Sequence, residues 1–236
     1  MFTVALVGAD GAGKSTIGKR VARMLPVPSR YIYMGVNLES SNLVLPTTRL
    51  WLGIKRAVGL RPDAVGPPRA RTTPRSGNPV KRWLYGLKSL LRLVNLIAEE
   101  WFRQCVVLYY RIGGCVVVLD RDFFLDSEAR DVFDPGARKP LDYRIHSYVL
   151  RHFYRKPDFV ICLDAPCEVL YARKREGTPD ALERRRQEYL GLRQIVERFT
   201  VVDAARPEET VAREVAELIV SFHRSIVAKS HKPRAA

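Results

Sequence analysis

The stretch that decides how this chain is interpreted is residues 2–25, FTVALVGADGAGKSTIGKRVARML. Residues 2–7 are a short apolar run rich in β-branched side chains, which is typical of a buried parallel strand. Residues 8–13 break this run with three glycines. Apolar residues then recur at helical spacing from 14 to 25. We therefore expect a strand, a tight glycine-rich loop and a helix in direct succession.

The loop at residues 8–15 fits the pattern G-x-x-x-x-G-K-[ST]. Backbone N–H groups in such a loop turn inward around phosphate oxygens, and the following helix directs the positive end of its dipole at the same anion. Lys14 would reach the β- and γ-phosphates of a nucleotide, and the Ser15 hydroxyl would face Mg²⁺. The alternative is a glycine-rich turn that binds nothing, but the strand–loop–helix context favours phosphate binding.

Four further segments are expected to be strands: 30–34 (RYIYM), 115–120 (CVVVLD), 158–164 (DFVICLD) and 200–203. Helices are expected at 83–110, 141–154, 166–175, 181–199 and 207–227. Strands that alternate with helices along the whole chain predict a doubly wound α/β fold with a mainly parallel sheet.

The middle of the chain has two unusual segments. Residues 61–82 contain five prolines, six basic residues and one acid, so they cannot bury enough apolar surface to order themselves, and we expect a mobile basic insertion. Lys88 and Arg92 interrupt the apolar surface of the helix expected at 83–110. A core or dimer-interface helix is the favoured interpretation, and a membrane-surface helix is the alternative. Residues 229–236 are expected to be a frayed basic tail.

Charged residues follow the third and fourth strands. Asp120 and Arg121 come directly after an apolar run, at the carboxyl end of the sheet, where ligands of such folds bind. Asp120 is a candidate Mg²⁺ group, with a helix or turn cap as the bland alternative, and Arg121 could clamp a phosphate with both arms of its guanidinium. Basic residues at 173–175 and 184–186 could close over the phosphates.

Composition sets the remaining expectations. The 236 residues carry 40 Lys and Arg against 25 acids, a net charge of +15. This excess indicates either an anionic partner or simply a soluble basic protein without one. The four cysteines form no CxxC pair and no signal peptide or membrane span is recognisable, so a cytoplasmic protein is expected. No nucleic-acid-reading motif is present, and the basic residues of 61–82 are not interleaved with aromatics, which makes nucleic acid an unlikely partner.

Taken together, four motifs resemble those of the thymidylate kinase family of P-loop nucleotide kinases. They are GADGAGKST (8–16), LDR (119–121), PDFVICLDAPCEVLYARKR (157–175) and VVDAARPEETVAREV (201–215). The resemblance implies one P-loop kinase-like domain over residues 1–228, with a five-stranded parallel sheet and a small lid. It also implies ATP and Mg²⁺ as cofactors and phosphoryl transfer to a small acceptor.

The resemblance also assigns roles to individual residues. Asp10 would contact the sugar of the acceptor and Arg121 its phosphate, while Arg173 and Arg175 would act as lid arginines because position 11 is glycine. The catalytic set would be Lys14, Arg121, Arg173 and Arg175, with Ser15 and Asp120 at the metal and Asp10, Arg121 and Arg103 at the acceptor. The residues expected to hold the nucleotide are Gly8, Ala9, Asp10, Gly11, Ala12, Gly13, Lys14, Ser15, Thr16 and Ala205.

The sequence departs from the family after the second strand. MGVNLESS (34–41) stands where the family has an acceptor-binding Arg-Glu-Pro stretch, and Asp122 replaces an aromatic residue or histidine. The arginine of the base-binding helix aligns near Glu99, one turn from Arg103. Residues 36–98 are therefore expected to carry a different or remodelled acceptor pocket.

Three functions remain open from the sequence. The leading one is an ATP-dependent kinase for a nucleoside monophosphate, with dTMP as the default acceptor. The second keeps the donor site but uses a sugar, a lipid-linked compound or another small hydroxyl acceptor. The third is a nucleotide-regulated binding module, and a homodimer stays open in every case.

Overall fold

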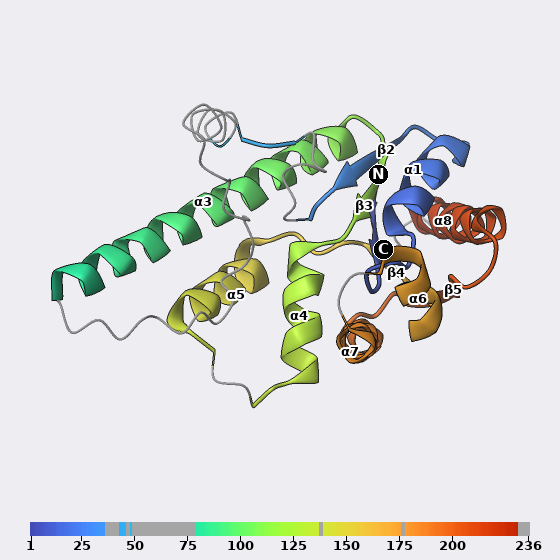
Figure 1. The fold of residues 1–236 in the computed structure, drawn as a ribbon. Coiled ribbons are helices and arrows are strands. Elements are labelled where there is room, and N and C mark those ends of the chain that lie inside the picture. The colour runs from blue at the N-terminus through green and yellow to red at the C-terminus, as the bar shows by residue number, and fades with distance from the viewer. Residues whose placement is uncertain (36–42, 46–47, 49–78, 137–138, 176–177, 231–236) are drawn as a thin grey trace, which may run out of the picture.

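A five-stranded, all-parallel sheet forms the centre of the molecule in the computed structural model (Figure 1). The structure describes all residues except 36–42, 46–47, 49–78, 137–138, 176–177 and 231–236. The strand order is β2-β3-β1-β4-β5. The strands are β1 (Thr3–Val7), β2 (Ser29–Tyr33), β3 (Val116–Asp120), β4 (Phe159–Asp164) and β5 (Phe199–Asp203).

The three inner strands are apolar because both of their faces are covered. Every residue of β1 and β3 is buried, and so are the first five residues of β4. On β1, Val4 and Leu6 join one apolar cluster while Ala5 and Val7 join the other. This alternation places the central strand between two hydrophobic layers.

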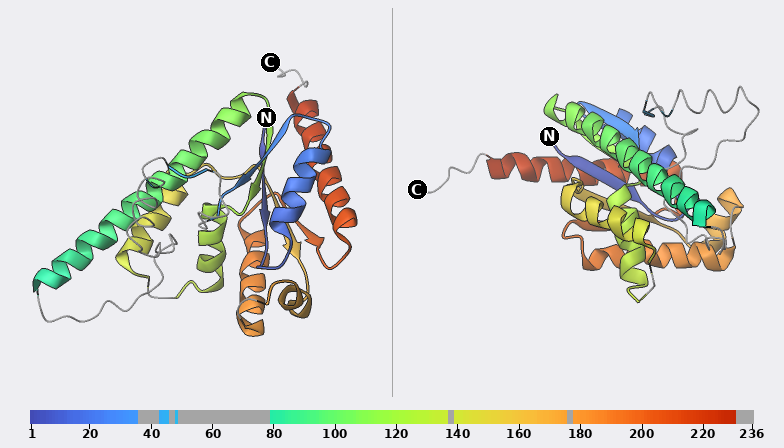
Figure 2. Two further views of the ribbon diagram at one scale, coloured as in Figure 1. Left: turned by 45° about the horizontal axis from the view of Figure 1, so that its top comes forward. Right: turned by 90° about the vertical axis from the view of Figure 1, so that its left-hand side faces the viewer.

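Helices supply both layers (Figure 2). The helices are α1 (Lys14–Met24), α3 (Pro79–Ile112), α4 (Phe123–Phe133), α5 (Leu141–Phe153), α6 (Cys167–Lys174), α7 (Pro179–Gly191) and α8 (Glu208–Ser230), with a 3₁₀ turn, η2, at Leu192–Gln194. Helices α1 and α8 pack together in the cluster that contains Val4. Helices α3, α4 and α5 contribute to the cluster that contains Ala5. The fold is thus α/β with helices flanking a parallel sheet.

The structure differs from the sequence predictions at one helix end, at one helix that was not predicted, and at the C-terminal tail. The helix expected at 181–199 ends at Gly191, and the chain turns through η2 before β5 begins at Phe199. No element was expected at 123–133, where α4 lies. Helix α8 runs to Ser230, so residues 229 and 230 are helical rather than part of a frayed tail, and 231–236 lie outside the described residues.

Helix α3 is the longest element. It begins at Pro79, so the last four residues of the expected insertion 61–82 are helical, while 61–78 lie outside the described residues. Proline suits this first position because the N–H that it lacks would have no helical partner there. At 1.5 Å per residue, the 34 residues of α3 extend for about 50 Å. Among the described residues no helix is long and apolar enough to cross a membrane.

Candidate functional site

The 8–15 loop leaves the carboxyl end of β1 and leads into α1. Gly8, Gly11 and Gly13 have φ angles of 143°, 90° and 83°, which glycine adopts without steric cost. At Gly11 a Cβ atom would lie 2.5 Å from the carbonyl oxygen of Leu170, so α6 approaches the loop too closely for any other residue. The glycines therefore set both the curvature of the loop and its packing against α6.

Lys14 folds back into the loop. Its Nζ atom donates to the carbonyl oxygens of Gly8 and Ala9 at 2.8 and 2.7 Å, and the residue is buried. Burial, together with the nearby positive charge of Arg121, lowers the pKa of the Lys14 ammonium to about 8. Among the described residues, the hydrogen-bond partners of this buried ammonium are carbonyl oxygens. An anion would satisfy it better than these carbonyls do.

Ser15 and Asp120 meet across the edge of the sheet. The Ser15 hydroxyl donates to Asp120 Oδ2 at 2.5 Å, and the Tyr31 hydroxyl donates to the same oxygen at 2.6 Å. Asp120 is fully buried, and its Oδ1 atom has no hydrogen-bond partner within the described part of the chain. Tyr31 was not expected at the site. It comes from β2, which pairs with β3 so that Tyr31 lies beside Val118.

The pair Ser15 and Asp120 fits Mg²⁺. This ion takes one or two protein oxygens and completes its shell with water and substrate phosphates. A hydroxyl and one buried carboxylate, whose second oxygen has no partner among the described residues, are such a donor set. In the described residues no three His, Cys, Asp or Glu side chains gather as a metal site built from protein alone. A Mg²⁺ ion held by these two residues would complete its shell with water or with substrate oxygens.

Arg121 lies next to the loop and forms an ion pair with Asp10. Its backbone N–H donates to Leu6 O at 3.0 Å, and its φ angle is 70°, in the left-handed region. Burial raises the pKa of the Asp10 carboxyl, but the cations Arg121, Lys14 and Lys174 outweigh it and lower that pKa below its ordinary value. The structure therefore brings Asp10, Lys14 and Arg121 together at the carboxyl edge of the sheet, as the sequence predicts.

Three residues from α4 and α7 extend this cluster. The Tyr189 hydroxyl donates to Asp126 Oδ1 at 2.7 Å, and Arg185 Nη2 donates to the Tyr189 hydroxyl at 2.8 Å. Burial alone would lower the pKa of Arg121, but the charges of Asp126 and Asp10 help to raise it above its ordinary value. Asp126 thus couples Arg185 and Arg121 electrostatically. Sequence reasoning gave no role to Asp126 or Tyr189, and Arg185 was considered only as part of the run 184–186.

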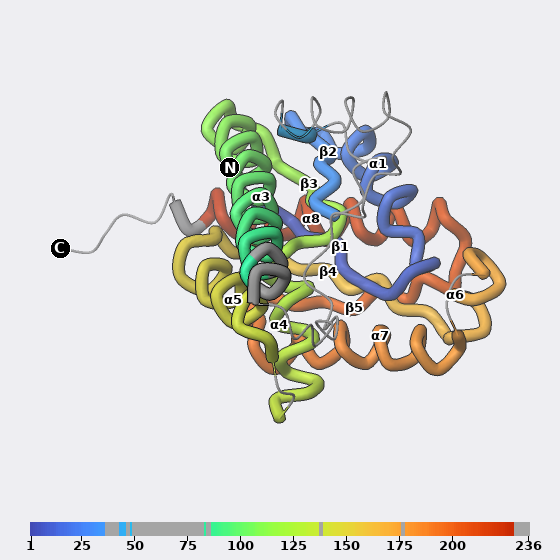
Figure 3. The backbone as a smooth tube through the Cα atoms, turned by 60° about the vertical axis from the view of Figure 1, so that its left-hand side comes forward, coloured from blue at the N-terminus to red at the C-terminus, as the bar shows by residue number. Residues whose placement is uncertain are grey.

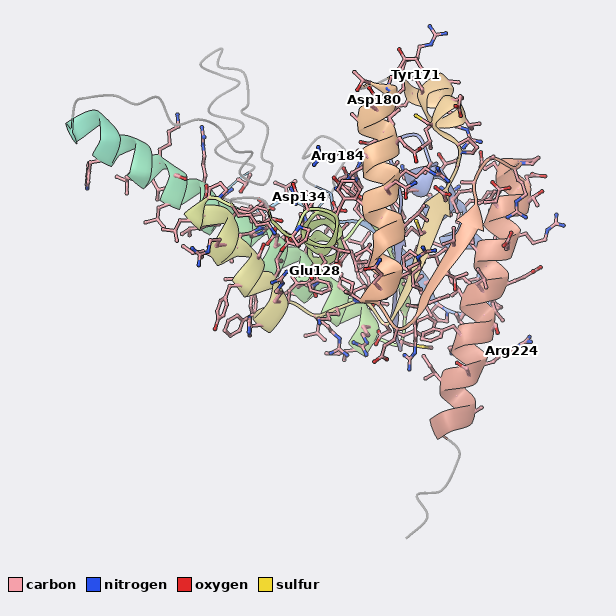
Figure 4. The ribbon with its side chains drawn as sticks, turned by 90° about the horizontal axis from the view of Figure 1, so that it is seen from below. Glu128, Asp134, Tyr171, Asp180, Arg184 and Arg224 are labelled. Atoms are coloured by element: carbon pink, nitrogen blue, oxygen red, sulfur yellow. The ribbon has the colours of Figure 1, made fainter. Side chains whose placement is uncertain are left out.

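The other two arginines of that run serve different contacts. Arg186 binds both carboxylate oxygens of Asp164, at 2.6 and 2.9 Å, and so ties α7 to the end of β4. Arg184 projects from α7 on the side of Asp134, with 3.9 Å between Nη2 and Oδ2 (Figure 4). One side chain of the three reaches the Asp126 cluster, because consecutive helical residues point in different directions.

The expected lid arginines lie on α6. Arg173 Nη1 donates to the carbonyl oxygen of Ala204 at 2.9 Å, which places its guanidinium at the loop that follows β5. Ala205 belongs to the same loop, where its N–H donates to Asp203 Oδ1 at 2.9 Å. Arg175 ends α6 in the left-handed conformation and is exposed. Thr16, also exposed, lines a hollow beside Ser15 together with Lys19, Arg20, Arg23 and Glu208.

Among the described residues, Arg103 makes no hydrogen bond or ion pair with Asp10 or Arg121, although its guanidinium lies 5.6 Å from the centre of the Phe123 ring. It is buried under the segment that follows β2, where it donates to the carbonyl oxygens of Gly35 at 2.5 Å and Leu43 at 3.1 Å. One turn earlier, both carboxylate oxygens of Glu99 accept from the N–H of Leu45 at 3.2 Å. Glu99 and Arg103 thus clamp this segment to α3.

Asp122, which the sequence marked only as a departure, caps α4. Its Oδ1 atom accepts from Leu125 N–H at 3.0 Å, while Oδ2 has no hydrogen-bond partner among the residues that the structure describes. Burial raises the pKa of this carboxyl to about 7. A group poised to titrate near neutrality therefore lies one residue from Arg121.

Comparison of the sequence with known proteins does not show a family for this chain. No protein-family model matches the chain, and no curated protein matches it significantly.

Proposed function

We propose that the protein is an ATP-dependent kinase, similar to thymidylate kinase, that moves the γ-phosphate of ATP to a nucleoside monophosphate. The observation that carries this proposal is the 8–15 loop, a cradle of the P-loop type. Its three left-handed glycines surround an inward-folded Lys14, and its Ser15 is held by a buried aspartate from the neighbouring strand. These are the kinds of group that bind the phosphates of a nucleoside triphosphate and its Mg²⁺.

The residues of the site would divide the work of phosphoryl transfer. Lys14 exchanges the carbonyls of Gly8 and Ala9 for phosphate oxygens, which restores full charge compensation to its buried ammonium. Ser15 and Asp120 would hold Mg²⁺, which neutralises charge on the phosphates. Because a phosphate oxygen of the monophosphate attacks the γ-phosphorus and ADP leaves, the protein needs mainly to align the two substrates and to stabilise the negative charge.

Arg121 would orient the acceptor. Its ion pair with Asp10 places the guanidinium between the donor loop and the Asp126 cluster, where a phosphate on the acceptor could replace the Asp10 carboxylate as its partner. Arg173 or Arg175 would have to leave its present position to reach the transferred group, since Arg173 is bound to Ala204.

One observation favours the second acceptor class, a sugar, a lipid-linked compound or another hydroxyl compound. Arg103, the nearest match to the base-binding arginine of thymidylate kinases, is committed to the backbone of Gly35 and Leu43. A nucleobase would then need other partners. The donor half of the proposal does not depend on this point.

A screen of ATP consumption against nucleoside monophosphates, sugars and lipid-linked alcohols tests the donor half. Lys14→Ala should lower turnover by about 10²–10⁴-fold, because a charge aimed at the transferring phosphate is worth several kcal/mol in a buried site. Arg224→Ala is the control, since this exposed cation lies on α8, away from the 8–15 loop (Figure 4), and its loss should leave turnover unchanged. If the protein binds nucleotide but turns over no acceptor, the result would instead support a nucleotide-regulated binding module.

Arg121→Lys separates the acceptor classes. If the acceptor carries a phosphate, the variant should raise the acceptor KM much more than it weakens ATP binding, because lysine offers a point charge where arginine offers a planar fork. If the acceptor is a plain hydroxyl compound, kcat should fall equally for every acceptor while the acceptor KM stays unchanged. The second result would replace the monophosphate acceptor by a hydroxyl compound.

A further inference from the structure

Helix α3 exposes a continuous apolar stripe along almost its whole length. The exposed apolar residues are Trp83, Leu87, Leu90, Leu91, Val94, Trp101, Leu108, Tyr109 and Ile112. Most are separated by three, four or seven positions, which places them on one helical face. From residue 83 to residue 112 this face extends for about 43 Å. Contiguous apolar surface on this scale marks an interaction site rather than ordinary solvent exposure.

The stripe points away from the body of the molecule. Leu93, Leu96 and Val107, on the other side of α3, are buried, and Val107 packs with the sheet residues Val117 and Leu119. Figure 1 and the left view of Figure 2 show the N-terminal half of α3 extending past the sheet, and Figure 3 shows α3 at the periphery of the fold. A flat surface could therefore approach the stripe without meeting the sheet.

The charged residues of the N-terminal half of α3 are all basic, while one acid of α5, Asp142, accepts from Ser89 Oγ at 3.4 Å. Between residues 79 and 98 the sequence has four basic residues and no acid, and the exposed Lys88 lies within this stretch. The two acids of α3 are buried and engaged: Glu99 accepts from Leu45, and Glu100 binds His146 Nε2 at 2.8 and 2.9 Å. Tryptophans at two levels of the stripe have amphipathic rings that suit the boundary between apolar and polar layers.

We propose that α3 docks on an anionic lipid bilayer, lying in the plane of its surface with the stripe in the headgroup region. An apolar face with tryptophan and leucine, on a helix whose other side carries lysine and arginine, is the chemistry of interfacial helices. The net charge of +15 adds long-range attraction to anionic lipid. A second copy of the chain fits less well, because it would bring two cationic helices together while Glu99 and Glu100, the only acids of α3, are already bonded internally.

Sedimentation of the full chain with lipid vesicles tests the proposal. The chain should bind vesicles of phosphatidylcholine and phosphatidylglycerol at 7:3, bind pure phosphatidylcholine at least tenfold more weakly, and lose affinity as salt is raised. Leu90→Glu combined with Val94→Glu changes two residues of the stripe that are 55% and 56% exposed, and should lower binding at least tenfold. Ile195→Glu, at a residue 46% exposed on a different surface, should bind as the wild type does.

Three results would overturn the proposal. One is no binding of the wild type to anionic vesicles at low salt. Another is equal binding by the wild type and the folded double variant. The third is a wild-type dimer in sedimentation velocity that the double variant converts to a monomer, without vesicle binding by either, which would make the stripe an interface between two copies. Since nucleotide is left out of the assay, failure here is independent of failure of the kinase proposal.

Discussion

Replacing Asp122 by asparagine should change how the stability of the protein depends on pH. Asp122 is fully buried at the first turn of α4, and one of its oxygens caps the helix through Leu125 N–H. Asparagine keeps this acceptor oxygen but cannot ionise. Any change that the extra N–H groups of asparagine make to the free energy of unfolding is the same at every pH. The change in stability between two pH values therefore reports only the ionisation of the Asp122 carboxyl.

The size of the effect follows from the pKa of Asp122, which burial raises to about 7. In the unfolded chain an aspartate has a pKa of about 3.9. Between these values the folded state binds more protons than the unfolded state, so this carboxyl makes the free energy of unfolding fall as pH rises. The free energy of unfolding falls by roughly 2–3 kcal/mol between pH 5 and pH 8. The largest fall that this difference in pKa can cause, over all pH values, is about 4 kcal/mol.

Urea unfolding of the wild type and Asp122→Asn at pH 5 and pH 8 measures this effect. The free energy of unfolding of the variant, relative to the wild type, should rise by about 2–3 kcal/mol from pH 5 to pH 8. Asp134→Asn is the control, because that carboxyl lies at the other end of α4 with its side chain half exposed, and the same comparison should give a change below about 0.5 kcal/mol. Parallel pH curves for the wild type and Asp122→Asn would refute the reasoning.

Three further predictions concern the loop and α7. Gly11→Ala should weaken nucleotide binding by at least 10²-fold and destabilise the fold by about 1–3 kcal/mol. The reason is that the added Cβ atom would lie 2.5 Å from Leu170 O, at a residue whose φ angle is 90°. Calorimetric titration measures the first effect and urea unfolding the second. Since burial lowers the pKa of Lys14 to about 8, nucleotide affinity should fall up to about tenfold per pH unit above pH 8 in the wild type, and Lys14→Ala should lose this dependence in the same titration. Arg186→Lys should cost about 1–2 kcal/mol in urea unfolding because it breaks a two-pronged contact, whereas Arg184→Lys, at a side chain 59% exposed, should cost less than about 0.5 kcal/mol.

The inner strands and the strand–loop–helix arrangement of residues 2–25 were predictable because each rests on local sequence. The strands β1, β3 and β4 are buried on both faces, so they are continuous apolar runs that need no alternation to be recognised. Asp120 and Arg121 end a strand next to β1, and parallel strands bring their carboxyl ends to one edge. That edge is where Ser15 and Asp10 lie.

Helix α4 escaped prediction because tertiary packing decides it. Phe123, Phe124 and Leu125 are buried at consecutive positions, so the apolar residues do not form the stripe that marks a surface helix. The available signal was Asp122, an N-cap residue directly before them.

The Asp126 cluster could not be found from spacing. Asp126 and Tyr189 are 63 residues apart, and their contact depends on how α4 packs against α7. The end of α7 was misjudged for a related reason. Periodicity continues past Gly191, but the chain must turn there to enter β5 beside β4.

The backbone of Arg121 has a consequence for substitutions at this position. A residue with a side chain costs about 1–2 kcal/mol in the left-handed region where its φ of 70° lies, whereas glycine has no such cost. Glycine at position 121 should therefore remove this backbone cost, but it would also remove the guanidinium that pairs with Asp10. Loop engineering for stability at this position would thus act against the role proposed for Arg121 at the acceptor.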